Sequence, residues 1–163
     1  EDVLTITRLA NESISDNWGF YPVTDEEARA MARDMRQIVH PRAILIAEEE
    51  ESGRPIGFAM SLPDLNLVLK GLNGRLLPCG WLKMLLRLPR LSSYRMWALG
   101  VIPEYQGKAI DTLLYRATYE AIYSDRMRLE INYVLEDNER MNNAIHKLGA
   151  RDLRRYRVYE MPV

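Results

Sequence analysis

A short segment, QGKA at 106–109, separates an apolar stretch ending at Val101 from an amphipathic stretch beginning at Ile110. Backbone N–H groups at a helix start have no partner inside the helix, and the helix dipole adds about half a positive charge there. Small residues let an anion approach, so we predict that this corner binds a diphosphate. Asp111 follows within the first helical turn. It is expected to repel that anion unless it points away, or else it only stabilises the helix start in a corner that binds no anion. Lys108 either offsets part of this repulsion or is simply a solvated charge.

The periodicity of apolar residues predicts the elements that hold this corner. Strands are expected over 94–101 and 129–134, and a shorter helix capped by Asn138 is followed by a closing strand over 156–160. Between the first two strands a helix is expected over 110–122, because apolar residues line one of its sides. These residues are Ile110, Leu113, Leu114, Ala117, Ala121 and Ile122.

The amino-terminal half also contains sequence patterns that predict secondary structure. Apolar and polar residues alternate over 3–8, which favours a first strand. Thr24 and Glu27 form a capping box ahead of an amphipathic helix. Segments 43–48 and 56–62 flank an acidic, glycine-containing turn and are typical of a hairpin.

Composition bounds the class of protein. A chain of 163 residues with 47% hydrophobic residues is expected to fold as a single domain, 1–163. Cys79 is the lone cysteine, which excludes an internal disulfide framework and a multi-cysteine zinc site, and no metal site is expected. Net charge of -1 gives no bulk attraction to nucleic acid, and no apolar run approaches the roughly 20 residues that span a bilayer. We therefore expect a cytoplasmic protein without a nucleic-acid partner.

The order of elements and the corner resemble the GNAT acyltransferase superfamily, whose members move an acyl group from a coenzyme A thioester to an amine. The signature of that superfamily is Gln or Arg, two residues, Gly, any residue, and Gly or Ala. Here Gln106 begins the pattern, Ala109 stands at the first expected Gly, and Asp111 stands at the second small position. The resemblance covers nearly the whole chain. It implies an α/β fold with a mixed, mostly antiparallel sheet, splayed central strands and flanking helices.

The last predicted helix also resembles the family's last helix, which starts with Asn and ends in Lys, any residue, Gly. Family members commonly carry, seven residues after that Asn, a tyrosine that protonates the departing thiolate, and Ile145 stands there. His146 is adjacent but is turned by about 100° on the helix, so we expect it at the surface. Tyr156 and Tyr159 on the closing strand are alternatives, although strand tyrosines more often pack.

The resemblance implies a set of site residues. Acyl-CoA, acetyl-CoA or another, is the expected donor, and a small-molecule amine is the expected acceptor. The candidate catalytic residues are Glu130, Glu136 and Tyr156. The candidate cofactor-binding residues are Leu99, Val101, Gln106, Gly107, Lys108, Ala109, Asp111 and Asn138. The candidate substrate-binding residues are Asn17, Trp18, Phe20, Tyr21, Asp64 and Asn66; solvated carboxylates, core-pinned aromatics and turn residues are the competing interpretations.

More specifically, the motifs NWGFYPVT, LPDLN, LGVIPEYQGKAID, VLEDN and YRVYE resemble the carboxy-terminal half of an uncharacterised bacterial group with two GNAT-like halves in tandem. This resemblance predicts that the start at Glu1 reflects excision from a longer chain or survival of one half. It also implies a second GNAT-like half or a homodimer partner.

A basic and apolar helical insertion is expected at about 65–92. From Leu65 to Pro103 the chain has six basic residues and no acidic residue. The run WLKMLLRLPRL within it spaces its cations helically and fills the remaining surface with apolar residues. Such an arc is expected to pack against a partner half or second subunit, to bind a long acyl chain, or to contact a membrane.

Three functions remain open from the sequence. The first is an acyl-CoA-dependent N-acyltransferase that acylates a small amine by direct transfer. The second is a catalytically inactive GNAT-like scaffold, because Asp111 and Ile145 depart from the pattern. The third is a lipid- or membrane-facing binding module.

Overall fold

The computed structural model describes residues 1–73, 75, 77–124 and 126–161. The chain divides into a sheet unit, Glu1–Asn132, and a C-terminal unit, Tyr133–Val163, which are described separately.

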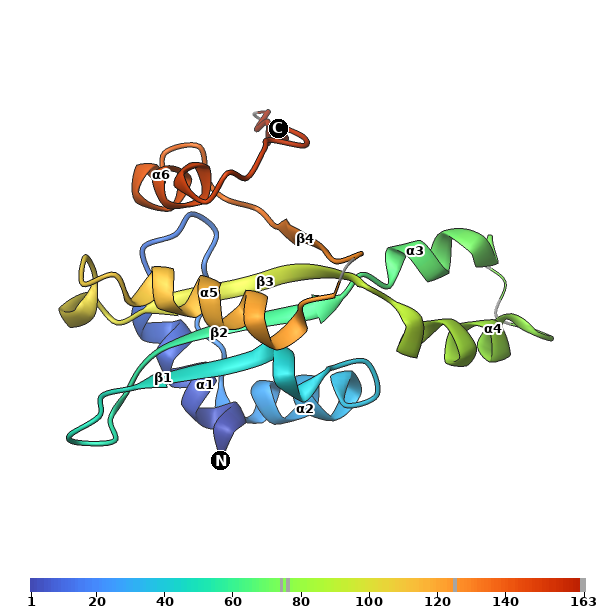
Figure 1. The fold of residues 1–163 in the computed structure, drawn as a ribbon, viewed down its shortest axis with the longest axis horizontal. Helices are drawn as coiled ribbons and strands as arrows, with labels where there is room; N and C mark the ends of the chain where they lie inside the picture. Colours follow the sequence, from blue (N-terminus) through green and yellow to red (C-terminus); the bar gives the residue numbers. More distant parts are fainter. Residues whose placement is uncertain (74, 76, 125, 162–163) are drawn as a thin grey trace. The chain divides into compact units, whose positions relative to one another are not determined.

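The sheet unit contains four strands in the order of the chain (Figure 1). The strands are β1 (Ile44–Glu48), β2 (Pro55–Pro63), β3 (Ser93–Val101) and β4 (Arg128–Ile131). The pairs β1–β2 and β2–β3 are antiparallel, and β3–β4 is parallel. The predicted hairpin and the mixed, mostly antiparallel sheet are confirmed.

Helix α1 (Asp2–Ser13) replaces the strand predicted over 3–8, so that prediction is wrong. Thr7 Oγ1 donates to Val3 O at 2.8 Å, a contact between successive helical turns. Leu9 is buried with Phe58 and Ile102, and α1 packs on β2 and β3. Alternation over six residues is too short to exclude a helix whose apolar face continues to Ala10.

Helix α2 (Asp25–Met35) begins at the predicted capping box. The backbone N–H of Glu27 donates to Thr24 Oγ1 at 3.3 Å, and the N–H of Thr24 donates to Glu27 Oε2 at 2.9 Å. Two donors at the helix start are thereby satisfied, and α2 packs against α1.

Successive residues of β2 pack into hydrophobic clusters on opposite faces of the sheet. Phe58 packs with Leu9 of α1, whereas Ala59 packs with Leu114 of α5 (Ile110–Ile122). Because strand side chains alternate, α1 and α5 cover the two faces (Figure 1). Gly100 faces α1 so closely that an added Cβ would lie 2.8 Å from Phe58 Cε1 and nearer still to Ser13 Oγ.

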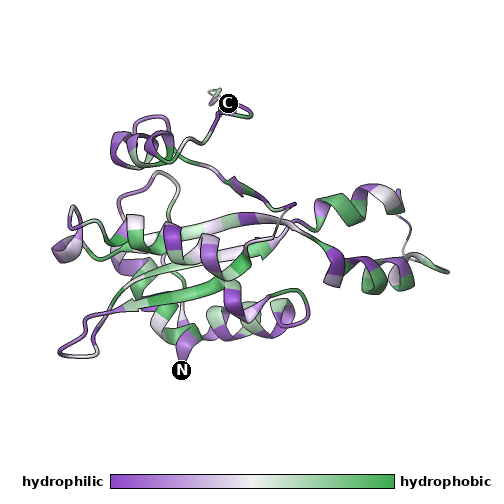
Figure 2. Ribbon diagram, viewed as in Figure 1, coloured by the Kyte–Doolittle hydropathy of each residue, from purple (hydrophilic) through white to green (hydrophobic). Residues whose placement is uncertain are grey.

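Between β2 and β3 the chain forms the α3–α4 segment, residues 66–90. It contains α3 (Asn66–Leu69), η2 (Lys70–Leu72), α4 (Gly80–Arg87) and η3 (Leu88–Arg90). Helices α3 and α4 pack against each other, and their ribbons carry long hydrophobic stretches (Figure 2). None of the helices in the described ranges has the length and apolar character needed to cross a bilayer.

The C-terminal unit contains α6 (Glu139–Lys147), which Asn138 caps as predicted by accepting from the N–H of Met141 at 3.1 Å. The closing strand predicted over 156–160 is wrong, because no strand occurs in the described residues of this unit. Its tyrosines lie exposed instead. Strand β4 also ends at Ile131 rather than near residue 134, since Tyr133 adopts a left-handed φ of 51°.

Candidate functional site

A bulge in β3 creates the first feature of the site. Met60 pairs with Ala98 and Ser61 pairs with Met96, so Trp97 has no residue opposite it. Pairing with β4 joins Ser93–Met96 to Arg128–Ile131 and continues no further among the described residues. Strand β4 ends at Ile131, so no described residue of β4 lies opposite β3 beyond Met96. The edge of β3 from Trp97 onward is therefore not paired with β4, as the splayed strands implied by the resemblance require.

The bulge also decides where the backbone of β3 points. Ile102 N–H donates to Ile56 O at 3.0 Å, and hydrogen-bonded positions in an antiparallel pair alternate. Gly100 and Ala98 therefore face β2, whereas Leu99 and Val101 turn their N–H and C=O groups away from it. Both residues predicted to bind the pantetheine arm lie at this open edge.

The corner after β3 turns through two left-handed residues. Gly107 has φ of 77° and Ala109 has φ of 62°, and Ala109 is the N-cap of α5. Within the described chain, no backbone–backbone hydrogen bond uses the N–H of Gly107, Lys108 or Ala109. The first three N–H groups of α5 likewise have no acceptor within the helix. The Gln106 side chain donates to Val101 O at 3.1 Å and joins the corner to the strand.

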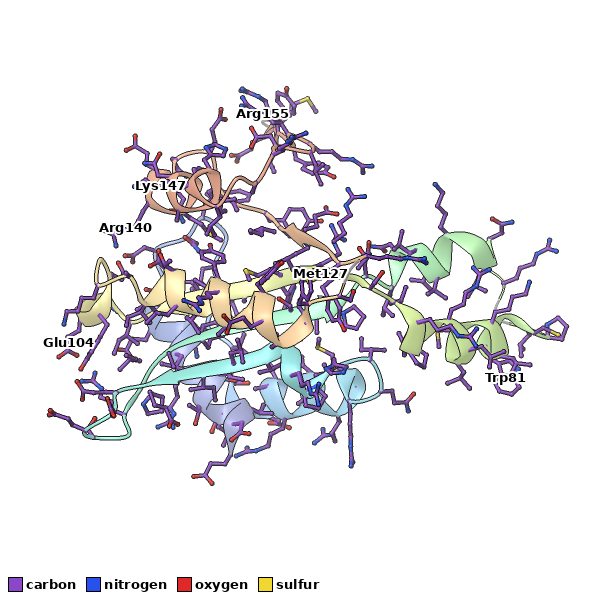
Figure 3. The ribbon with its side chains drawn as sticks, viewed as in Figure 1. Trp81, Glu104, Met127, Arg140, Lys147 and Arg155 are labelled. Carbon is purple, nitrogen blue, oxygen red and sulfur yellow. The ribbon has the colours of Figure 1, made fainter. Side chains whose placement is uncertain are left out.

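Contacts with the β1–β2 turn hold the corner in place. Tyr105 OH donates to the Glu49 carboxylate, and Arg54 lies 2.9 Å from Glu104 (Figure 3). Hydrogen bonds from Ser52, and then from Tyr105, lower the pKa of Glu49, and the bond to Glu49 raises the pKa of Tyr105.

Lys108 lies against the ring of Tyr105. Its Nζ is 4.4 Å from the centre of the Tyr105 ring, a cation–π distance. The ammonium is exposed, so it places positive charge beside the free N–H groups of the corner. This contact favours the interpretation in which Lys108 offsets the negative charge of Asp111.

Asp111 lies on the inward face of α5. It is half-buried and shares that face with buried Tyr115 one turn later and with Thr118 after that. Burial, and then the Asp111 charge, raises the pKa of Tyr115 to about 12. Among the described side chains none forms an ion pair or hydrogen bond with the Asp111 carboxylate. Its negative charge lies in the first turn of α5, where it would repel an anion.

Glu130 lies one residue before the end of the β3–β4 pairing. Its Oε1 is 3.1 Å from Arg95 Nη2, and the same nitrogen is 3.2 Å from Asn132 Oδ1. Glu130 thus ties the two strands together immediately before they separate. Neither Arg95 nor Trp97 was predicted as a site residue. The only signal in the sequence is that the spacing of apolar residues on one face of the strand changes from two residues to three after Met96.

The predicted substrate residues occupy two loops. The first loop follows α1 and carries Asn17, Trp18, Phe20 and Tyr21. Trp18 and Tyr21 are 71% and 78% exposed, so the core does not pin these two rings, whereas Phe20 is half-buried. Asp64 and Asn66 form the turn after β2, where the N–H of Asn66 donates to Asp64 Oδ1 at 3.3 Å. That contact matches the turn interpretation.

The remaining predicted residues belong to the C-terminal unit. Glu136 lies 3.9 Å from Arg155 and 4.0 Å from Arg157, and the Tyr156 ring lies 6.1 Å from that of Tyr133. Ile145 is buried on α6, whereas His146 is exposed and lies 3.2 Å from Asp152. The hydrogen bond from His146 lowers the pKa of Asp152. The surface position predicted for His146 is observed.

Several solved structures with similar folds are acetyltransferases. An aminoglycoside acetyltransferase, AAC(6')-Iy, in complex with a bisubstrate analogue matches 99% of this chain and 92% of its own at TM-score 0.62 and 17% identity. An N-acetyltransferase from Staphylococcus aureus Mu50 matches 91% of this chain and 76% of its own at TM-score 0.61 and 18% identity. A GNAT family acetyltransferase from Brucella melitensis in complex with acetyl-CoA covers 86% of this chain and 75% of its own, with TM-score 0.51 and 14% identity. This chain has the GNAT fold.

Two curated relatives extend the comparison beyond fold. A bacterial ceramide synthase from Caulobacter vibrioides is 34% identical over 98% of this chain, and Protein YghO from Escherichia coli K12 is 33% identical over 100% of it. The chain spans 43% of the length of each relative. No family model matches the chain. The GNAT fold therefore occurs here in a chain much shorter than the relatives it matches.

Proposed function

We propose that this chain binds an acyl-coenzyme A along the open edge of β3 and transfers the acyl group to an amine. The observation that carries the proposal is the bulge at Trp97, which leaves the backbone groups of Leu99 and Val101 facing away from β2. That edge leads directly to the anchored corner at 106–109. One continuous surface thus offers amide partners first and anion-binding N–H groups next.

The residues present fit such a donor. Leu99 N–H, Leu99 C=O and Val101 N–H can pair with the amide groups of a pantetheine arm as a neighbouring strand would. The N–H groups of Gly107 and Lys108 suit a diphosphate, and the exposed Lys108 ammonium adds charge. Asp111 would weaken this end of the site by repelling the diphosphate. When bound, an acyl thioester supplies a carbonyl activated for attack by an amine.

Direct transfer needs positioning and proton transfer more than a nucleophilic side chain. We propose Glu136 and Tyr156 as candidates to accept or supply these protons. Glu130 is the third candidate from the sequence, but its ion pair with Arg95 favours positioning over proton transfer. Ile145 cannot donate a proton, so a thiolate released here takes its proton from water or from another residue. The proposal also includes a cytoplasmic location, a small amine as the acceptor, and a second GNAT-like half or a second copy of the chain as the partner.

The name of one relative suggests a different acceptor. A ceramide is an amide of a fatty acid and a long-chain amino alcohol, so a ceramide synthase forms the type of bond proposed here. We therefore propose a long-chain donor and a long-chain amino alcohol as the second substrate pair to test. A small polar amine with acetyl-CoA is the first pair.

A scaffold without catalysis is the second candidate function. Asp111 at the helix start and Ile145 on α6 favour it, because one repels the diphosphate and the other cannot protonate a thiolate. The two candidates make opposite predictions for binding of coenzyme A.

Thermal unfolding with acetyl-, octanoyl- and palmitoyl-coenzyme A distinguishes them. A ligand at a hundred times its dissociation constant stabilises the fold by about 2.7 kcal/mol, which is readily measured. Stabilisation by pantetheine alone tests binding at the strand edge, and stabilisation by adenosine diphosphate alone tests binding at the corner. Release of thiol in the presence of each amine then measures transfer. No stabilisation by any of the three thioesters contradicts the transferase and supports the scaffold.

A further inference from the structure

The exposed side chains of α4 form an apolar arc without a partner in the described part of the chain. We define the arc by four residues, which are Trp81 at 48% exposure, Leu82 at 45%, Leu85 at 54% and Leu86 at 57%. At about 100° per residue these positions occupy one continuous side of the helix. Figure 2 shows hydrophobic colour along α4, and Figure 3 places Trp81 at its start.

The opposite side of α4 packs against the rest of the α3–α4 segment. Gly80 is buried, Met84 is half-buried, and α4 packs against α3. A Cβ at Gly80 would meet the backbone oxygen of Arg75, and a Cβ at Gly71 would lie 3.1 Å from Arg87 Nη1. The contact with α3 therefore leaves the apolar arc uncovered, because it lies on the other sector of the helix.

Basic side chains lie next to the arc and around it. Lys83 lies beside the arc on α4, whereas Arg87 lies nearer the side that packs against the rest of the segment, and both are exposed. The α3–α4 segment also carries Lys70, Arg75 and Arg90, with no acidic residue from Leu65 to Pro103 in a chain of net charge -1. A partner that covers this surface must be apolar where the arc lies and anionic around it.

We infer that the α3–α4 segment docks on the surface of an anionic lipid bilayer. The apolar arc enters the boundary between headgroups and acyl chains, while Lys83 and its basic neighbours contact lipid phosphates. A bilayer surface is favoured because an anionic membrane complements both features at once, with its acyl boundary facing the apolar arc and its phosphates facing the surrounding cations. The segment would lie on the membrane, and docking does not depend on the acyl transfer proposed above.

The test is co-sedimentation of this chain with vesicles, made either of phosphatidylglycerol and phosphatidylcholine or of phosphatidylcholine alone. We expect binding to the anionic vesicles, weak binding to the neutral ones, and a decline as salt shortens the range of the charges. Lys83→Glu should weaken binding about 30-fold, because each charge is worth about 1 kcal/mol at such a surface. Leu85→Ser should weaken it about tenfold through lost apolar burial.

Leu113→Ser provides the matched control, because Leu113 is an exposed leucine on α5, outside the segment. It should bind vesicles as the unmodified chain does. A variant with Trp18→Phe and Trp97→Phe leaves Trp81 as the only tryptophan, and its emission should shift to the blue with anionic vesicles. Equal binding to both vesicle types, or no effect of Lys83→Glu and Leu85→Ser, overturns the inference. Absence of vesicle binding together with self-association that Leu85→Ser abolishes also overturns it and assigns the arc to a second copy.

Discussion

Deletion of Trp97 tests whether the bulge creates the donor-binding edge. Met96 and Ala98 become neighbours in the shortened strand, and Ala98 and Leu99 keep the faces on which they pack now. The deletion therefore regularises the backbone while leaving the core residues inward. With a regular β3, the chain after Ile131 can extend the pairing past Met96 once Tyr133 leaves its left-handed φ of 51°, and that pairing occupies the backbone groups at the open edge.

The expected loss follows from the groups concerned. Leu99 N–H, Leu99 C=O and Val101 N–H are the three backbone groups at the open edge. Each net hydrogen bond contributes about 0.5–1.5 kcal/mol, so losing all three weakens coenzyme A binding by about 10-fold to 2,000-fold. Trp97→Ala is the control, because it keeps the extra residue and removes a side chain that is 47% exposed.

Isothermal titration calorimetry with coenzyme A measures both variants, and circular dichroism reports whether they fold. Trp97→Ala should bind within about threefold of the unmodified chain, since it retains every backbone group. A folded deletion variant with unchanged affinity refutes the reasoning, as does an equal loss in Trp97→Ala. If the deletion prevents folding, Leu99→Pro removes one N–H that does not face β2 and should weaken binding about 2- to 12-fold. Unchanged affinity in Leu99→Pro also refutes it.

Three further predictions concern the corner, the core and pH. Asp111→Asn removes a charge at the start of α5 and should tighten coenzyme A binding about two- to fivefold in calorimetry, since such a charge is worth about 0.3–1 kcal/mol; weaker binding contradicts the repulsion. Gly100→Ala should lower the free energy of unfolding by about 1–3 kcal/mol in urea titrations, and adding Ser13→Ala should restore part of the loss because Ser13 Oγ is the nearest obstacle. The pKa of Tyr115 rises from 10.0 to about 12 on folding, so its contribution to stability is complete below pH 10 and is lost as pH rises toward 12. Tyr115→Phe should remove that alkaline decline, and an identical decline in both proteins would show that another group causes it.

The residues of the corner were accessible from sequence, but their geometry was not. QGKA after an apolar strand predicts free N–H groups at a helix start, because that property belongs to a few consecutive residues. The sequence does not show that Ala109 takes the left-handed conformation, or that Asp111 faces inward beside Tyr115. Those features depend on how α5 packs against the sheet.

Glu130 illustrates the same limit for a candidate catalytic residue. From sequence it is a carboxylate near a predicted strand, equally suited to accept a proton or to face solvent. Its role as a tie between strands required the register that places Arg95 opposite it. Arg95 precedes it by 35 positions, so no local pattern joins the two.

The sequence by itself determined the features that depend on neighbouring residues, namely the capping box at Thr24, the hairpin of β1 and β2, and the cap at Asn138. Only the tertiary structure decided that residues 3–8 are helical, that residues 156–160 form no strand, and that β3 bulges at Trp97. Caps and turns satisfy their hydrogen bonds within a few residues. A strand instead satisfies its N–H and C=O groups on distant chain segments, so its existence and register depend on partners that local spacing does not specify.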